Sequence, residues 1–159
     1  MRYWLMKSEP SEMSIDAVAA MPEQTVEWFG VRNYQARNFM RDLMQPGDLG
    51  LFWHSSCKNP GVYGLVEIVT AAHPDSHQFD LQSKYYDPKS TRENPRWWCV
   101  DVKFMQKTRY VSIEELRAHS ALSTLTVLQK GNRLSITPVD YKEWHIINQL
   151  IITADMNLL

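Results

Sequence analysis

The sequence lacks most of the patterns that assign a chain to a chemical class directly. It has only two cysteines, Cys57 and Cys99, and neither lies in a CxxC pair, so neither a disulfide framework nor a cysteine-rich metal site is indicated. There is no GxGxxG, no P-loop, no GxSxG and no HExxH, the usual marks of dinucleotide, NTP, hydrolase and zinc-protease sites. We therefore expect a protein that is not an enzyme and that holds no cofactor and no metal ion.

A strong net charge and a long apolar run are also missing. The formal net charge is -1, so this is not a polycation that holds nucleic acid by bulk electrostatics, and any such binding requires a local patch. The apolar residues near the N-terminus are interrupted by Lys7 and Glu9, too early for a signal peptide or a membrane span. We expect a cytoplasmic protein, or a nuclear one in a eukaryote, with no membrane partner.

What is present suits one globular domain over residues 1–159. The chain is 44% hydrophobic, which allows a sizeable core, and no linker, repeat or low-complexity run divides it. We expect a monomer. Short strands with helices between the early ones and more at the end predict an α+β fold, a curved, mostly antiparallel sheet or small barrel with short helices around it.

The expected elements follow from alternation, helical spacing and capping residues. Strands are predicted at 2–7, 25–29, 49–55, 62–72, 97–105 and 134–137, and helices at 14–20, 34–43, 112–119, 122–129 and 138–151. Gly64, in the middle of a strand, indicates a bend or a close approach by another element. The polar segment 73–96 is predicted to be a long loop, and such loops are often lids or binding segments.

The densest group of planar and charged side chains is WFGVRNYQARN, residues 28–38. Asn33 is predicted to cap the helix that follows, and the polar stripe of that helix includes Arg37 and Arg41. Together with Arg32, these side chains would attract a phosphate or another anion near the start of the helix. Ordinary surface ion pairs with nearby acidic residues are the alternative.

A second basic region lies between Lys84 and Arg109, with seven basic residues against three acidic ones. Counterions released by local cations favour binding to a polyanion even when the whole chain is nearly neutral. From both regions we select five candidate contacts to a nucleic-acid backbone: Arg32, Arg37, Lys84, Arg92 and Arg96.

Six longer motifs occur in order along nearly the whole chain: YWLMKSEP, WFGVRNYQARNFM, FWHSS, PGVYGLVEIV, RWWCVDVKF and RLSITPV. Together they resemble the EVE domain family, of the thymocyte nuclear protein type, in the PUA-like superfamily that also contains the YTH domains. The resemblance implies a small β-barrel flanked by helices and binding to DNA with modified bases, or to RNA.

The resemblance also implies a base pocket where three of these motifs meet. It places Lys7 and Ser8 at the lip, Trp28 as an aromatic wall, Asn33 and Tyr34 with Arg32 around the mouth, and His54 and Ser55 at the floor or rim. From its residue type alone, Trp53 is a further candidate stacking plane.

Such a pocket would hold a base turned out of its strand. Stacking contributes roughly 1 to 3 kcal/mol per base, and extrusion from a duplex costs a few kcal/mol. Stacking on one aromatic wall therefore only about offsets the cost of extrusion, and contacts to the nucleic-acid backbone must supply the net binding free energy. Two other functions stay open: a small nucleotide-like ligand, and a hydrolase that uses His54 and Ser55. If Trp28 is a pocket wall, Trp28→Ala should abolish binding with little change in melting temperature.

Overall fold

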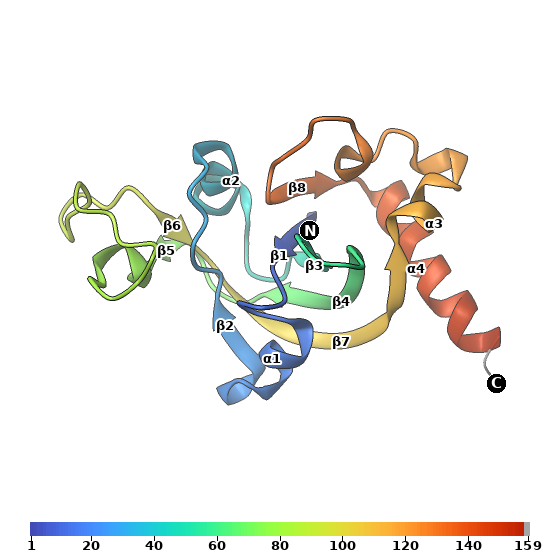
Figure 1. Cartoon of the computed structure of the whole chain (residues 1–159), viewed down its shortest axis with the longest axis horizontal. Helices are drawn as coiled ribbons and strands as arrows, with labels where there is room; N and C mark the ends of the chain where they lie inside the picture. Colours follow the sequence, from blue (N-terminus) through green and yellow to red (C-terminus); the bar gives the residue numbers. More distant parts are fainter. Residues whose placement is uncertain (158–159) are drawn as a thin grey trace.

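The computed structural model describes residues 1–157 and the side chains of residues 1–153. A six-stranded sheet has the order β2-β7-β4-β3-β1-β8 (Figure 1). Its strands are β1 (Tyr3–Ser8), β2 (Thr25–Glu27), β3 (Leu49–His54), β4 (Gly61–Ile68), β7 (Asp101–Ser112) and β8 (Ile136–Val139), and β5 (His73–Pro74) pairs with β6 (Trp98–Cys99). The α-helices are α1 (Ile15–Ala20), α2 (Tyr34–Asn38), α3 (Ile113–Arg117) and α4 (Tyr141–Asn157). A π-helix, η2 (Phe39–Leu43), follows directly on α2, and the 3₁₀ helices are η1 (Pro22–Gln24), η3 (Ser76–Phe79), η4 (Ser120–Leu122) and η5 (Thr126–Leu128).

The prediction of a mixed α+β fold with a curved, mostly antiparallel sheet is confirmed, but the small β-barrel that the family resemblance implies is wrong. The sheet curves strongly, with β7 wrapping along its lower side in Figure 1. Its outer strands are short: β2 pairs with β7 over three residues and β8 pairs with β1 over four, and within the described residues no pairing joins β2 to β8. The sheet therefore stays open.

One pair of strands is parallel, and it determines where the site lies. β1 runs parallel to β3, with Tyr3 opposite Leu49 and Ser8 opposite His54. The carboxyl ends of two parallel strands meet at the same edge of a sheet, so the residues that follow β1 and β3 come together. The backbone N–H of Ser55 donates to the carbonyl of Ser8 at 3.0 Å across this edge.

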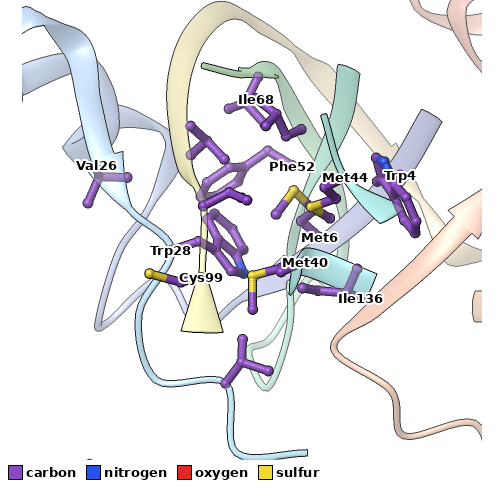
Figure 2. Close-up of a cluster of buried hydrophobic side chains, with 14 of the residues drawn as sticks. Trp4, Met6, Val26, Trp28, Met40, Met44, Phe52, Ile68, Cys99 and Ile136 are labelled. Carbon is purple, nitrogen blue, oxygen red and sulfur yellow. The ribbon is translucent and has the colours of Figure 1, made fainter. Parts of the chain in front are cut away.

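Both faces of the sheet are covered by apolar side chains. Along β3, Phe52 belongs to one buried cluster, whereas Leu51 and Trp53 belong to another, as the alternation of a strand requires. Figure 2 shows the first cluster, in which Trp28 lies close to Phe52 and Met40. The second cluster packs under α4. Within the described residues, no helix is both apolar enough and long enough to cross a bilayer.

The predicted helix starts are mostly confirmed. The side chains of Ser14, Asn33 and Ser112 each accept a hydrogen bond from a backbone N–H three residues later. The last helix begins later than predicted, because Pro138 is paired with β1 in β8. Its true start is a reciprocal pair in which Asp140 and Glu143 each accept from the backbone N–H of the other.

Gly64 shows the close approach that its position predicts. A Cβ placed on it would lie 2.5 Å from the Ile15 side chain and 2.9 Å from the Gln106 carbonyl. The missing side chain lets α1 pack directly on the sheet. This contact places the N-terminus of α1 beside the end of β3, next to the site described below.

Candidate functional site

An open cavity of about 380 Å³ lies at the carboxyl ends of β1 and β3. Four other segments complete its wall: the turn after β1, the end of β2 with the residues after it, the loop that contains Tyr85, and the segment that leads into β8. Its lining residues are Lys7, Ser8, Glu9, Glu12, Met13, Val26, Glu27, Trp28, Phe29, Gly30, Val31, Arg32, Ser55, Ser56, Tyr85, Arg133 and Ser135.

Two polar side chains at the end of β1 face this cavity, and they differ in whether they already have a hydrogen-bond partner in the protein. The half-buried ammonium of Lys7 has no hydrogen-bond or ion-pair partner in the described part of the chain, and burial lowers the pKa of this side chain. The Ser8 hydroxyl donates to the Met13 carbonyl at 2.7 Å, so it offers only acceptor lone pairs to a ligand. Lys7 is therefore an available donor without a protein acceptor.

Trp28 lines the cavity and also belongs to the core. Its side chain is only 6% exposed and meets Phe52 edge to face at a centroid distance of 5.5 Å. Figure 2 shows it among the buried side chains, close to Met40 and Cys99. The expectation that Trp28 can be truncated with little change in melting temperature does not agree with this burial, because the indole supports the core as well as the wall.

Arg32 lines the cavity, but its guanidinium already has protein partners. It donates to the Asp75 carboxylate at 3.0 Å and to the carbonyl of Tyr85 at 2.8 Å, and it lies over the rings of Tyr85 and Trp97. Asp75 is buried and also accepts from the backbone N–H groups of Gly30 and His77. This network joins the loop after β5 to the segment after β2, so the guanidinium of Arg32 is already engaged by protein groups.

Tyr85 closes one side of the cavity through contacts with Gly30 and Glu12. Gly30 has a φ of +85°, and a Cβ on it would lie 2.8 Å from the Tyr85 ring, so glycine is required for this packing. The Tyr85 hydroxyl donates to the Glu12 carboxylate at 2.7 Å, and Lys84 pairs with the same carboxylate. Burial alone would raise the pKa of Glu12, but these hydrogen bonds outweigh it and lower that pKa.

Two of the predicted pocket residues lie away from the cavity. Trp53 is 2% exposed and packs in the second core cluster, because it points to the opposite face of β3 from Phe52. His54 is on the correct face but is covered by α1: its Nε2 accepts from the backbone N–H of Ile15 at 3.2 Å, and its ring stacks on Tyr63 at 3.9 Å. Ser55, the next residue, does line the cavity.

The remaining predicted mouth residues are also absent from the lining. Asn33 caps α2, and Tyr34, which is 52% exposed, stacks on Trp97 at 4.8 Å. Arg37 lies over the Tyr34 ring and donates to the carbonyl of Arg96 at 2.7 Å. These side chains form an ordered surface next to the loop rather than the wall of the cavity.

The predicted cations of the long loop are dispersed. Lys84 reaches the rim through Glu12, whereas the guanidinium of Arg92 lies over the Phe79 ring at 4.8 Å. Neither Arg92 nor Arg96 lines the cavity. The sequence predicts a basic patch in this loop. In the structure, of these three loop cations only Lys84 contacts a residue of the cavity lining.

Among the cavity residues that were not selected from the sequence are Glu12, Tyr85 and Arg133. Arg133 begins the RLSITPV motif and has no acidic residue near it in sequence, a signal that could have identified it as an unpaired cation. For Glu12 and Tyr85 no local signal exists, because their contact joins residues 73 positions apart.

The geometry argues against the alternative that His54 and Ser55 act together as the base and nucleophile of a hydrolase. The Nε2 of His54 already accepts a backbone hydrogen bond, and burial lowers the pKa of the ring, so it is not positioned to activate Ser55. Burial strongly raises the pKa of Cys99, the opposite of what a thiolate nucleophile needs. Within the described residues, no cluster of three or more His, Cys, Asp or Glu side chains could hold a metal ion.

The sequence and the fold of this chain were compared with those of known proteins. Mouse thymocyte nuclear protein 1 is 42% identical over 166 residues, covering 93% of this chain and 73% of its own length. The crystal structure of human THYN1 protein in complex with 5-methylcytosine-containing DNA is 41% identical, with a TM-score of 0.87 over 94% of this chain and 97% of that one.

A more distant likeness extends to the fold alone. The Mmi1 YTH domain, solved in complex with RNA, matches with a TM-score of 0.55 at 16% identity over 99% of this chain and 82% of that one. The sequence profile of the EVE domain matches residues 2–150, nearly the whole chain. The chain therefore belongs to the EVE domain family.

Proposed function

We propose that this protein binds nucleic acid and holds one modified base, turned out of its strand, in the cavity beside Trp28. The observation that carries the proposal is the cavity itself. It is open, it has a volume of about 380 Å³, and its lining combines an indole with the unpartnered ammonium of Lys7. Ligand pockets commonly measure about 300 to 1,000 Å³ and combine apolar walls with a few polar groups that fix the ligand's orientation.

The energetics require the polar groups. A single aromatic wall contributes roughly 1 to 3 kcal/mol of stacking, which about offsets the cost of extruding the base. A hydrogen bond to a charged group contributes roughly 1.5 to 3 kcal/mol more. Lys7 is positioned to donate such a bond to an acceptor on the base, since no protein group competes for it.

The human relative directs the choice of ligand. That protein was solved with DNA that contains 5-methylcytosine, and it is 41% identical to this chain, so 5-methylcytosine in DNA is the first modification to test. Burying one methyl group contributes roughly 0.8 kcal/mol, about a fourfold preference over cytosine. A larger preference would require a polar contact that the unmodified base leaves unsatisfied. We propose binding without chemical turnover.

Fluorescence anisotropy with labelled oligonucleotides of one sequence tests this proposal. The oligonucleotides carry cytosine or 5-methylcytosine at one position, as single strands and as duplexes, and the free nucleosides serve as competitors. We expect the modified oligonucleotide to bind more tightly by about fourfold or more and the free nucleosides to compete poorly. Equal affinity for both oligonucleotides with strong competition by a nucleoside would favour a small-molecule pocket instead.

A matched pair of variants locates the binding. Lys7→Met keeps the length of the apolar stem but removes the ammonium, and Lys142→Met makes the same change on the exposed face of α4, outside the cavity lining. We expect Lys7→Met to weaken binding and Lys142→Met to leave it unchanged. If the two variants bind equally well, the cavity is not the binding site.

A further inference from the structure

Three cationic side chains line the cavity, and they differ in how much of their charge is available. Arg32 is held by Asp75 and by the carbonyl of Tyr85. Lys7 is half-buried on β1, inside the wall. Arg133 is exposed and has no hydrogen-bond or ion-pair partner among the side chains of residues 1–153, the ones that the structure describes. Of the three, only Arg133 offers a free guanidinium to something outside the cavity.

The other cations near the site are engaged or distant. Lys84 pairs with Glu12, and Arg37 donates to the carbonyl of Arg96 and to the side chain of Asn38. Arg92 lies over Phe79 and does not line the cavity. A ligand at the mouth of the cavity would therefore meet Arg133 without first breaking a protein ion pair.

Hydrogen bonds on the C-terminal side of Arg133 hold the segment that carries this side chain against β1. Gly131, with a φ of +79°, turns the chain after η5, and the Asn132 side chain accepts from the backbone N–H of Leu134 at 3.1 Å. The carbonyl of Ser135 then accepts from the backbone N–H of Lys7 at 2.8 Å. The segment that carries Arg133 is thus joined to the strand that carries Lys7.

We propose that Arg133 contacts the phosphate backbone of the bound nucleic acid at the mouth of the cavity, while Lys7 contacts the enclosed base. This assignment rests on the proposed function above. An extruded base leaves its phosphates outside the pocket, where an exposed cation can reach them. The planar guanidinium suits bidentate contact with a phosphate. Phosphate contacts add affinity but carry no direct information about the base.

The test is a salt titration of binding with Arg133→Gln and Arg133→Lys. Arg117→Gln is the matched control, because Arg117 is an exposed arginine on α3 that does not line the cavity. We expect Arg133→Gln to weaken binding to the modified and unmodified oligonucleotides by the same factor, roughly tenfold at low salt. The slope of log K against log salt should become shallower by about 0.9 for a duplex or about 0.7 for a single strand. Arg133→Lys should keep the wild-type slope.

Two outcomes would overturn the assignment while leaving the proposed function in place. An unchanged slope and affinity in Arg133→Gln would show that Arg133 does not contact phosphate. A changed ratio between modified and unmodified oligonucleotides in that variant would make Arg133 a base contact instead. Failure of the wild-type protein to bind any oligonucleotide would refute the proposed function itself. Thermal unfolding of each variant confirms that it is folded.

Discussion

Trp28 has to satisfy two requirements that the sequence could not separate. It packs against Phe52 in the core, and it forms part of the cavity wall. Truncating a buried tryptophan to alanine costs about 3 to 5 kcal/mol, so we expect Trp28→Ala to lower the free energy of unfolding by about this amount. Urea unfolding followed by circular dichroism measures the loss. A change well below 1 kcal/mol would show that the indole acts as a wall alone.

Trp53 is the natural control for the role of Trp28 in binding. It is equally well buried but belongs to the other core cluster and does not line the cavity. Trp28→Phe and Trp53→Phe should therefore both be folded and moderately destabilised, and only Trp28→Phe should weaken binding of the modified oligonucleotide. Weaker binding by both variants to the same extent would mean that the loss follows from stability and not from the wall.

Asp75 holds together more of the site than its position in a polar loop indicates. Its carboxylate accepts from Arg32, from Gly30 and from His77. Asp75→Asn keeps the shape but turns one acceptor into a donor that faces these N–H groups, and leaving the buried end of an ion pair unsatisfied costs on the order of 3 kcal/mol. We expect a loss of that size in urea unfolding, with faster amide exchange between β5 and β6.

Asp42→Asn is the comparison for Asp75→Asn. Asp42 pairs with Arg41 on the exposed side of η2, where an ion pair contributes little. If Asp42→Asn and Asp75→Asn lower stability equally, the network around Asp75 does not clamp the loop.

Individual residues also show how much of the site the sequence could reveal. Lys7, Ser8, Trp28, Arg32 and Ser55 were selected from the sequence and line the cavity. Trp53 could not be separated from them by alternation, because β3 is buried on both faces and a strand covered on both sides has no polar face to mark its orientation.

At the scale of elements, one hydrogen bond ties α1 to β3. The N-terminal N–H of α1, from Ile15, donates to Nε2 of His54 at 3.2 Å, so the imidazole must be neutral to accept it. Burial lowers the pKa of His54 below its ordinary value. The unfolded chain therefore binds a proton at a higher pH than the folded chain does, and stability should fall as the pH drops below about 6.5.

Urea unfolding at pH 7.5 and at pH 5.5 tests this linkage, with His54→Gln as the variant because its side-chain oxygen remains an acceptor but does not titrate. We expect the variant to lose less stability than the wild type between the two pH values. Equal losses would show that His54 does not titrate in this window.

His73 provides a comparison of opposite sign. Burial opposes its protonation, but its hydrogen bonds to the Asp101 carboxylate and the Pro74 carbonyl outweigh burial and raise its pKa. A raised pKa in the folded state contributes stability below about pH 6.5 that is lost as the pH rises through the folded value. His73→Gln should therefore steepen the loss of stability on acidification, whereas His54→Gln should reduce it.

Elements were predicted better than their connections. Capping residues such as Ser14 and Ser112 act on amides three positions away, so local sequence determines these helix starts. Closure of the sheet depends instead on whether β2 and β8, more than a hundred residues apart, can pair. Pro138 illustrates the same limit: its spacing favours a helix start, but pairing with Trp4 of β1 places it in a strand.

For the molecule as a whole, the near-neutral charge constrains how the proposed nucleic-acid ligand can be held. The net charge is -1, and most cations near the site are paired within the protein, which leaves Lys7 and Arg133 as the unpartnered cations of the cavity lining in the described chain. With Arg133 on a phosphate and Lys7 on the base, the slope of log K against log salt should be about -1 for a duplex. Lengthening the oligonucleotide beyond the site should then add little affinity.

Anisotropy titrations between 50 and 300 mM salt, with oligonucleotides of two lengths, measure both quantities. A steep slope, of about -5 or beyond, would require many phosphate contacts and hence a basic surface much larger than the cavity rim. A shallow slope together with a preference for the modified base would mean that affinity comes mainly from what the cavity encloses. In that case the small number of unpaired cations at the cavity would serve selectivity, because a protein with low non-specific affinity spends little of its time bound to unmodified nucleic acid.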